Sequence, residues 1–269
     1  MYMVLGAIVG FFAGLLGIGG GLIIVPALTF IFTSQDFPPD RILHLALGTT
    51  MAAIIFTSAI SLYTHHKHAA VDWGIFKSMT PGIIIGTLLG TVLAGALSSL
   101  ILRIIFTLFI CYAATNMLFK LMSKATSKLD LNSDHHKQPG KSGFFAAGSV
   151  IGATSSIVAI GGGILTVPFL TLCNVKLQRA IGTAAAIGFP IALTGTIGYA
   201  LNGIHYTQNL PEYSVGYIYL PAVCWLVSTS VFTTPLGAKT THSAQTTTLR
   251  KIFVVLLYSL ACKMLIDLF

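Results

Sequence analysis

GIGGGLIIVP, residues 17–26, interrupts an apolar run that extends from residue 2 to residue 32. Three consecutive glycines should break a helix here, since each costs roughly 1 kcal/mol relative to alanine; they are Gly19, Gly20 and Gly21. The pattern returns as IGGGILTVP at residues 160–168, with Gly161, Gly162 and Gly163. In hydrocarbon, a broken helix is tolerated only where the break is buried in protein or lines a wet cavity. Paired breaks in corresponding halves of a membrane protein indicate a transport site.

The composition is that of a polytopic helical membrane protein. Of 269 residues, 55% are apolar and only 8% are charged, whereas soluble proteins average about 25% charged residues. Several windows exceed the roughly 18 apolar residues that a spanning helix needs. A water-soluble domain is therefore excluded. We interpret the net charge of +8 as orientation signals flanking the spans and not as a surface for nucleic acid.

No cofactor and no metal site are predicted. The four cysteines occur singly, without the spacing of a disulfide framework or a zinc site. His65, His66 and His68 form a loop cluster, which is more often solvated than metal-binding. The apolar spans contain no Asp or Glu, so a sodium or proton site built on buried carboxylates is not expected.

Landmarks of the first half return in the same order in the second half. LALGT at residues 45–49 is followed by RAIGT at residues 179–183, and LRIIF at residues 102–106 by LRKIF at residues 249–253. We also match Pro221 to Pro81. The chain is thus predicted to consist of two transmembrane repeats, residues 1–122 and 143–269, joined by a hydrophilic linker at residues 123–142.

The distribution of Lys and Arg distinguishes two arrangements of these halves. If each glycine segment crosses the membrane, the halves are parallel and the two sides carry seven and eight basic residues, which is no bias. If each segment enters and returns, the second half is inverted and one side keeps only Arg41, Arg103 and Lys263. The opposite side then collects Lys67, Lys77, Lys120, Lys124, Lys128, Lys137, Lys141, Lys176, Arg179, Lys239, Arg250 and Lys251. The inverted arrangement is the one that satisfies the positive-inside rule.

We therefore predict an all-α polytopic membrane protein built from two inverted repeats. Each repeat should contain one glycine-broken, re-entrant segment and three transmembrane helices, which gives six full crossings. Both termini and the loop at residues 33–40 should face outside. The linker at residues 123–142 should face the cytoplasm.

These landmarks resemble the sulfite exporter TauE/SafE family. The resemblance rests on GLLGIGGGLIIVPAL at residues 14–28, LGT at 47–49, LRxxF at 102–106 and the second glycine motif. It covers nearly the whole chain apart from the linker, and it implies a multi-pass protein of the bacterial plasma (inner) membrane that exports or takes up sulfite and sulfonated organic acids. Thr154-Ser155-Ser156 precede the second triplet where Ala13-Gly14-Leu15 precede the first, so strict symmetry of the site is not expected.

The chemistry at the breaks favours a small anion. A helix that restarts after the glycines leaves its first N–H groups unpaired and carries about half a positive charge. Sulfite, a sulfonate or a carboxylate would fit such an N-terminus without a basic side chain. The candidate substrate-binding residues are the two triplets (Gly19, Gly20, Gly21, Gly161, Gly162, Gly163) and nearby hydroxyls (Thr49, Thr50, Thr183, Ser155, Ser156). The alternative is that the glycines serve helix packing and the hydroxyls bond within or across helices.

The predicted function is transport of a small sulfur-containing anion through a mid-membrane site at the two broken helices. Transport of another small solute, such as a carboxylate or a metal ion, is the alternative. An intramembrane enzyme is not predicted, because no HExxH or GxSxG motif and no buried carboxylate is present. The only partners expected are the small anion and the lipid bilayer. The exact substrate, direction, coupling ion and oligomeric state are left open.

Overall fold

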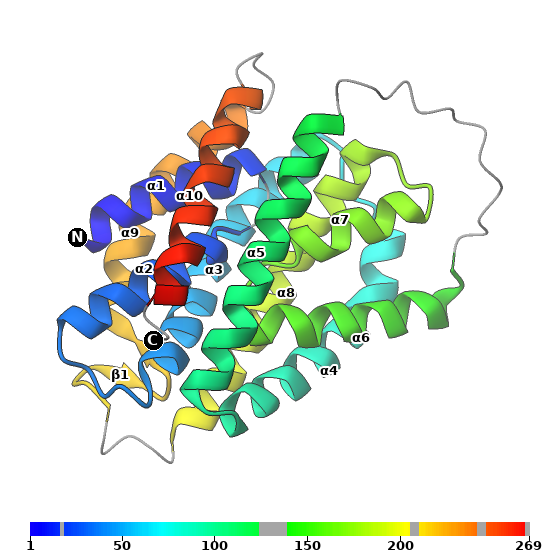
Figure 1. The fold of residues 1–269 in the computed structure, drawn as a ribbon. Coiled ribbons are helices and arrows are strands. Elements are labelled where there is room, and N and C mark those ends of the chain that lie inside the picture. Colours follow the sequence, from blue (N-terminus) through cyan, green and yellow to red (C-terminus); the bar gives the residue numbers. More distant parts are fainter. Residues whose placement is uncertain (17–18, 124–138, 205–209, 241–245, 267–269) are drawn as a thin grey trace.

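The fold is all-helical, as predicted, apart from one short β-hairpin (Figure 1). The computed structural model describes residues 1–16, 19–123, 139–204, 210–240 and 246–266. These residues form α1 (Tyr2–Leu16), α2 (Gly21–Ser34), α3 (Ile42–Lys67), α4 (Trp73–Ala96), α5 (Ser99–Ser123), α6 (Lys141–Ile157), α7 (Gly163–Leu172), α8 (Leu177–Gly203), α9 (Leu220–Thr240) and α10 (Thr246–Ile266). Strands β1 (Ser214–Val215) and β2 (Ile218–Tyr219) pair antiparallel before α9. Most of the predicted linker lies outside the described residues.

Five of the described helices are long and apolar enough to cross a membrane: α3, α4, α5, α8 and α9. The prediction of a helical membrane protein is thereby confirmed. Six crossings were predicted, one more than the five candidate spans among the described residues. The sixth candidate, α10, has 21 residues, but three of them are Arg250, Lys251 and Lys263. Helices α2 and α7 have 14 and 10 residues, which is too short to span roughly 30 Å of hydrocarbon.

Helices α3 and α8 pack against each other and form the centre of the molecule. Residues 42–54 are buried without exception, and a helix that is covered on all sides belongs to the interior of a large or membrane-spanning fold. Small residues permit the close approach, because a Cβ added at Gly195 of α8 would lie 3.1 Å from the sulfur of Met51 on α3. Helices α4, α5 and α9 lie farther out and expose apolar side chains such as Leu89, Leu108 and Phe232.

The two halves are packed crosswise: α1 of the first half lies against α9 of the second, and α6 of the second lies against α4 of the first. Glycines form both contacts. A Cβ added at Gly6 would lie 2.5 Å from the carbonyl oxygen of Leu226, and one at Gly148 would lie 2.5 Å from that of Met79. Close backbone approach through small residues is the usual way in which membrane helices pack. Each half thus packs its first helix against a helix of the other half.

This crosswise packing fixes how the two repeats align and corrects one prediction. Gly6 and Gly148 are 142 positions apart, as are Gly19 and Gly161, whereas their partners Met79 and Leu226 are 147 positions apart. The residue that corresponds to Pro81 is therefore at position 228, so the match of Pro81 to Pro221 is wrong. Pro221 is the second residue of α9, whereas Pro81 is the ninth of α4. Proline is tolerated in the first turn of a helix, because an N–H at that position would have no acceptor within the helix anyway. The position of Pro221 therefore says little about how the two repeats align.

Both glycine-broken segments fold back on themselves. At the open end of the first, the Tyr2 hydroxyl donates a hydrogen bond to Oε1 of Gln35, 2.9 Å away, which joins the start of α1 to the residue after α2. At the open end of the second, the rings of Phe144 in α6 and Phe169 in α7 lie 6.2 Å apart, edge to face. Figure 1 shows α1 beginning at the left of the molecule and α6 beginning at its right. The segments are two helical hairpins, α1–α2 and α6–α7.

Candidate functional site

The glycine triplets form the turns of the two hairpins. We call residues 19–21 the first tip and residues 158–163 the second tip. Gly20 and Gly162 are the N-cap residues of α2 and α7, with φ of 80° and 75° in the left-handed region. Only glycine adopts that conformation without steric cost. The breaks predicted from the sequence thus occur at the predicted residues, and each ends in a helix N-terminus.

The two tips touch each other. A Cβ added at Gly19 would lie 3.2 Å from the Cα of Gly161, and one at Gly21 would lie 2.0 Å from the carbonyl oxygen of Ala159. The second tip is also covered by the central helix α8, because a Cβ at Gly188 would lie 2.7 Å from the carbonyl oxygen of Gly161. The structure therefore brings the two triplets together, backbone against backbone, beside the central helices.

In each tip, the first N–H groups of the helix have no backbone acceptor among the described residues. In α2, the N–H groups of Ile23 and Ile24 donate to the carbonyl oxygen of Gly20, at 3.1 and 3.2 Å. In α7, Leu165 and Thr166 donate in the same way to Gly162. The N–H groups before these have no acceptor within their own helix, and a glycine N-cap has no side chain to supply one. Such a terminus is positively polarised and suited to an anion.

Three buried hydroxyls near the tips have no hydrogen-bond partner among the described residues: Thr50, Ser155 and Thr166. Thr166 lies in the first turn of α7, and its Oγ1 is 3.5 Å from the position that a Cβ on Gly162 would take. Ser155 lies in the last turn of α6, and its carbonyl oxygen accepts the N–H of Ile160 in the second tip at 2.9 Å. An unpaired buried hydroxyl is costly, so these groups mark a position where a polar ligand would be stabilised.

Thr166 was not among the residues predicted from the sequence. Its signal was present, however, in the comparison of the two motifs, because GGGLIIVP has Ile24 where GGGILTVP has Thr166. With the same offset of 142, Ser155 corresponds to Ala13. Ser155 and Thr166, which flank the second tip, therefore have no hydroxyl counterpart beside the first tip. Thr50 comes from α3, one turn before Ile54, whose Cγ2 lies 3.3 Å from a Cβ added at Gly19.

The other predicted hydroxyls have partners within the protein. Thr49 Oγ1 accepts the backbone N–H of Tyr219 at 3.0 Å, and Thr183 Oγ1 accepts that of Asp72 at 2.9 Å. Each bond joins a central helix to the residue before or at the start of a helix in the opposite half. The Ser156 hydroxyl donates to the carbonyl oxygen of Ala153 at 2.9 Å. All three hydroxyls bond to the backbone. The two threonine bonds are reciprocal, because each half supplies one threonine acceptor to a backbone N–H of the other half.

The histidine cluster is not in a loop, as the sequence suggested: His65 and His66 lie in the last turn of α3, and His68 is its C-cap residue. The ring of His66 lies edge to face on Trp73, 5.4 Å between centroids, and no group of three potential metal ligands gathers in the part of the chain that the structure describes. His44 is fully buried where α3, α4 and α5 meet. Its Nε2 is 3.1 Å from the carbonyl oxygen of Ala94, and its Nδ1 is 3.4 Å from Ser99 Oγ.

Comparison with known proteins identifies the family of this chain. The family model described as sulfite exporter TauE/SafE matches residues 2–264. A probable membrane transporter protein of Haemophilus influenzae is 35% identical over 262 residues, which are 97% of this chain and 96% of that protein. The probable membrane transporter protein YunE of Bacillus subtilis is 26% identical over 280 residues, 98% of this chain and 96% of that protein. No solved structure matches. The chain belongs to the sulfite exporter TauE/SafE family of membrane transporters.

Proposed function

We propose that this protein carries a small sulfur-containing oxyanion, sulfite or a sulfonate, across the bacterial plasma membrane through a site between the two tips. The observation that carries the proposal is that the tips with the glycine N-caps of α2 and α7 meet at one contact between the halves, and that Ser155 and Thr166, in the elements flanking the second tip, carry buried hydroxyls with no partner among the described residues. Such a site offers hydrogen-bond donors from several directions and no acidic group. A sulfite or sulfonate group has three oxygens that can accept those bonds at once.

None of the residues that we assign to this proposed site has a basic side chain, and this favours transport over tight binding. Backbone N–H groups and the helix dipole hold an anion with partial charges only, and hydroxyls add neutral donors. The spans contain no Asp or Glu that would repel an anion. A carrier must release its substrate on the opposite side, which a full buried counter-charge would oppose.

We assign the direct contacts to the glycines of both tips, to Thr50 and Ser155 from the predicted set, and to Thr166, which the sequence did not single out. Ser155 and Thr166 both belong to the second half, where the first half has Ala13 and Ile24. The oxyanion is therefore expected closer to the second tip than to the first. Thr49, Thr183 and Ser156 are assigned a supporting role, because their hydroxyls already bond to the backbone.

The arrangement in the membrane that we propose is the inverted one, with residues 1–122 and 143–269 as repeats and both hairpins re-entrant. The split of basic residues supports it, and so do the hydrogen bond between Tyr2 and Gln35 and the reciprocal contacts of the halves. The linker at residues 123–142 would then face the cytoplasm and both termini the outside. The tips would meet near the middle of the membrane, where broken helices of other transporters hold their substrates.

The experiment is anion-dependent thermal unfolding of the purified protein, with sulfite, methanesulfonate, acetate and chloride. We expect sulfite and methanesulfonate to raise the unfolding temperature. Thr166→Val should weaken binding by about tenfold or more, since a hydrogen bond to a charged group contributes roughly 1.5–3 kcal/mol. A preference for acetate would instead indicate a carboxylate carrier.

The matched control is Thr87→Val. The Thr87 hydroxyl is also buried and unpaired among the described residues, but it lies between α4 and α6, 2.9 Å from a Cβ added at Gly152. This variant should bind the anions like the wild type. Equal affinities of the wild type and Thr166→Val would contradict the proposed site.

A further inference from the structure

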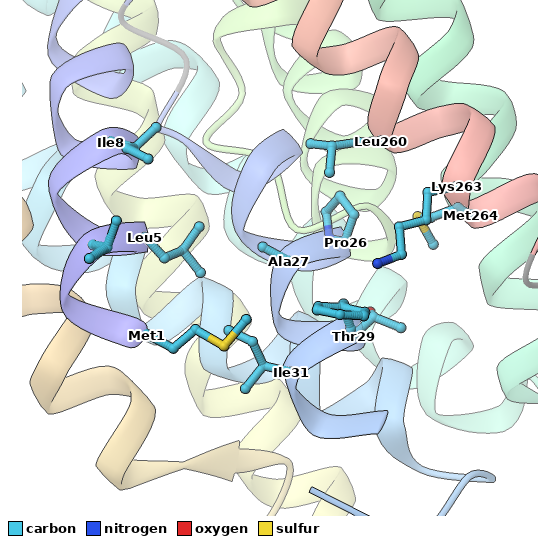
Figure 2. A pocket seen from close by; sticks show the side chains of 12 residues that line it. Met1, Leu5, Ile8, Pro26, Ala27, Thr29, Ile31, Leu260, Lys263 and Met264 are labelled. Carbon is cyan, nitrogen blue, oxygen red and sulfur yellow. The ribbon is translucent and has the colours of Figure 1, made fainter. Parts of the chain in front are cut away.

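A cavity of about 440 Å³ opens between the legs of the first hairpin and α10, at the open end and not at the tip (Figure 2). This volume falls within the roughly 300–1,000 Å³ of small-molecule sites. Its walls come from three elements: Met1 with α1, the middle of α2, and the last turns of α10. The lining residues are Met1, Val4, Leu5, Ile8, Pro26, Ala27, Thr29, Phe30, Ile31, Leu260, Lys263 and Met264.

The walls are apolar except at Thr29 and Lys263. Thr29 is the only lining residue with a hydroxyl, and that hydroxyl donates to the carbonyl oxygen of Val25 at 2.8 Å. Apart from the Lys263 ammonium, a small, strongly hydrated anion would therefore find almost no hydrogen-bond donor along these walls. The cavity is unsuited to the solute that we propose for the tips, and it is suited to a hydrocarbon chain.

The single charged side chain of the lining is Lys263. Figure 2 shows it reaching from α10 toward α2, and its Nζ lies 3.1 Å from the centroid of the Phe30 ring. Among the described residues, no carboxylate forms a salt bridge with it. Asp267, four positions further along, lies outside the described residues. The ammonium group thus stands at the edge of an apolar groove, close to the end of α10.

The groove is open to the surroundings of the protein, because Val4, Ile8 and Phe30 in its walls are exposed. On a membrane-embedded chain, such apolar surfaces face lipid. A lysine near the end of a membrane helix extends its charge to the head-group region. A membrane lipid could therefore place its acyl chain in this groove and its head group beside the lysine.

We propose that the groove holds an acyl chain of an anionic phospholipid, whose head-group phosphate binds the Lys263 ammonium. The cation gives the preference for a negatively charged head group, and the apolar walls exclude a free hydrophilic anion. Because α1 and α2 form opposite walls, the lipid would set the spacing of the hairpin that carries Gly19 to Gly21. The binding itself does not depend on which solute the protein transports.

The test is lipid retention by native mass spectrometry after exchange into detergent with equal amounts of phosphatidylglycerol and phosphatidylethanolamine. The wild type should retain phosphatidylglycerol preferentially. Lys263→Gln should lower that retention by about fivefold, the factor that corresponds to roughly 1 kcal/mol per Lys near an anionic lipid surface. The matched control is Lys251→Gln, which removes an exposed charge from the other end of the same helix and should change nothing.

Two further variants make the outcome specific to the groove. Ala27→Phe fills the cavity without altering its charge and should lower retention of both lipids. Asp267→Asn should leave the effect of Lys263→Gln intact, because the proposal assigns the ammonium to the phosphate and not to Asp267. Equal retention of the two lipids by the wild type, or unchanged retention in Lys263→Gln, would overturn the proposal. The anion-dependent unfolding described above would stand unaffected by either result.

Discussion

Gly19 and Gly161, 142 positions apart in the chain, face each other so closely that a Cβ on Gly19 would lie 3.2 Å from the Cα of Gly161. A Cβ at this point would push its neighbours apart by a few tenths of an ångström, and the φ of +78° at Gly19 disfavours a side chain as well. The contact joins the turns of the two helical hairpins, and with them the N-termini of α2 and α7. A substrate site at this contact would be built half from each repeat, which explains why the same motif is needed twice.

The first prediction concerns the spacing of the tips. Gly21→Ala should separate them, because its Cβ would lie 2.0 Å from the carbonyl oxygen of Ala159. That oxygen belongs to the backbone, so it cannot move aside as the end of a side chain could. We expect a loss of about 1–3 kcal/mol in the free energy of unfolding, the usual cost of overpacking, together with a loss of anion affinity. Gly140→Ala is the control, since among the described residues, apart from its chain neighbours, no atom lies within 4 Å of its added Cβ. Normal anion transport by a folded Gly21→Ala protein would refute the importance of this contact.

The second prediction separates supporting threonines from ligands. Thr49→Val and Thr183→Val each remove the acceptor of a backbone N–H from the opposite half. Each should lower the free energy of unfolding by roughly 1–3 kcal/mol, the cost of a buried donor left unpaired. Affinity for sulfite, measured below the unfolding transition, should change little. A large loss of affinity without loss of stability would show that these hydroxyls bind the substrate directly.

The third prediction concerns orientation in the membrane. In a background without native cysteines, Ser34→Cys should react with a membrane-impermeant thiol reagent added from outside, and Ser133→Cys should react only after the membrane is opened. The reason is that the inverted arrangement leaves three of the fifteen basic residues outside, as the positive-inside rule requires. The opposite labelling pattern would reverse the assignment of sides.

The fourth prediction concerns the driving force. No Asp or Glu lies within the spans, and the buried His44 already contacts the carbonyl oxygen of Ala94. An anion moving outward gains about 2.3 kcal/mol per elementary charge at 100 mV, negative inside. Sulfonate flux in proteoliposomes should therefore follow an imposed potential without a sodium or proton gradient. Uphill sulfonate movement driven by a proton gradient alone at zero potential would reveal a missed titrating group, and His44→Gln would then be the first variant to measure.

The sequence was sufficient for the class of fold and for the position of the breaks. Three glycines in hydrocarbon leave few structural solutions, so Gly19 to Gly21 and Gly161 to Gly163 predict interrupted helices on physical grounds alone. Their mutual contact followed from the duplication. Counting Lys and Arg predicted re-entrant segments. The hydrogen bond between Tyr2 and Gln35 brings the two ends of the first segment together, while the course of that segment through the membrane stays a prediction.

The roles of single hydroxyls could not be predicted in the same way. Thr49 and Thr50 are neighbours in the sequence, yet Thr49 accepts a backbone N–H from residue 219 while Thr50 has no partner among the described residues. That difference depends on contacts between the halves. The correspondence between residues of α4 and residues of α9 in the two repeats was likewise hidden, because it is set by the packing of Gly6 on α9 and of Gly148 on α4 and not by the conspicuous prolines.

The most direct test of the central claim is a structure determined with selenite, the heavier analogue of sulfite, in which the selenium atom is located by its anomalous scattering. The account predicts a selenium peak between the two tips, within hydrogen-bond reach of the Thr166 hydroxyl and the first N–H groups of α7, and no such peak in Thr166→Val. A peak at any other place in wild-type protein that transports selenite, or binding that persists unchanged in the variant, would contradict it.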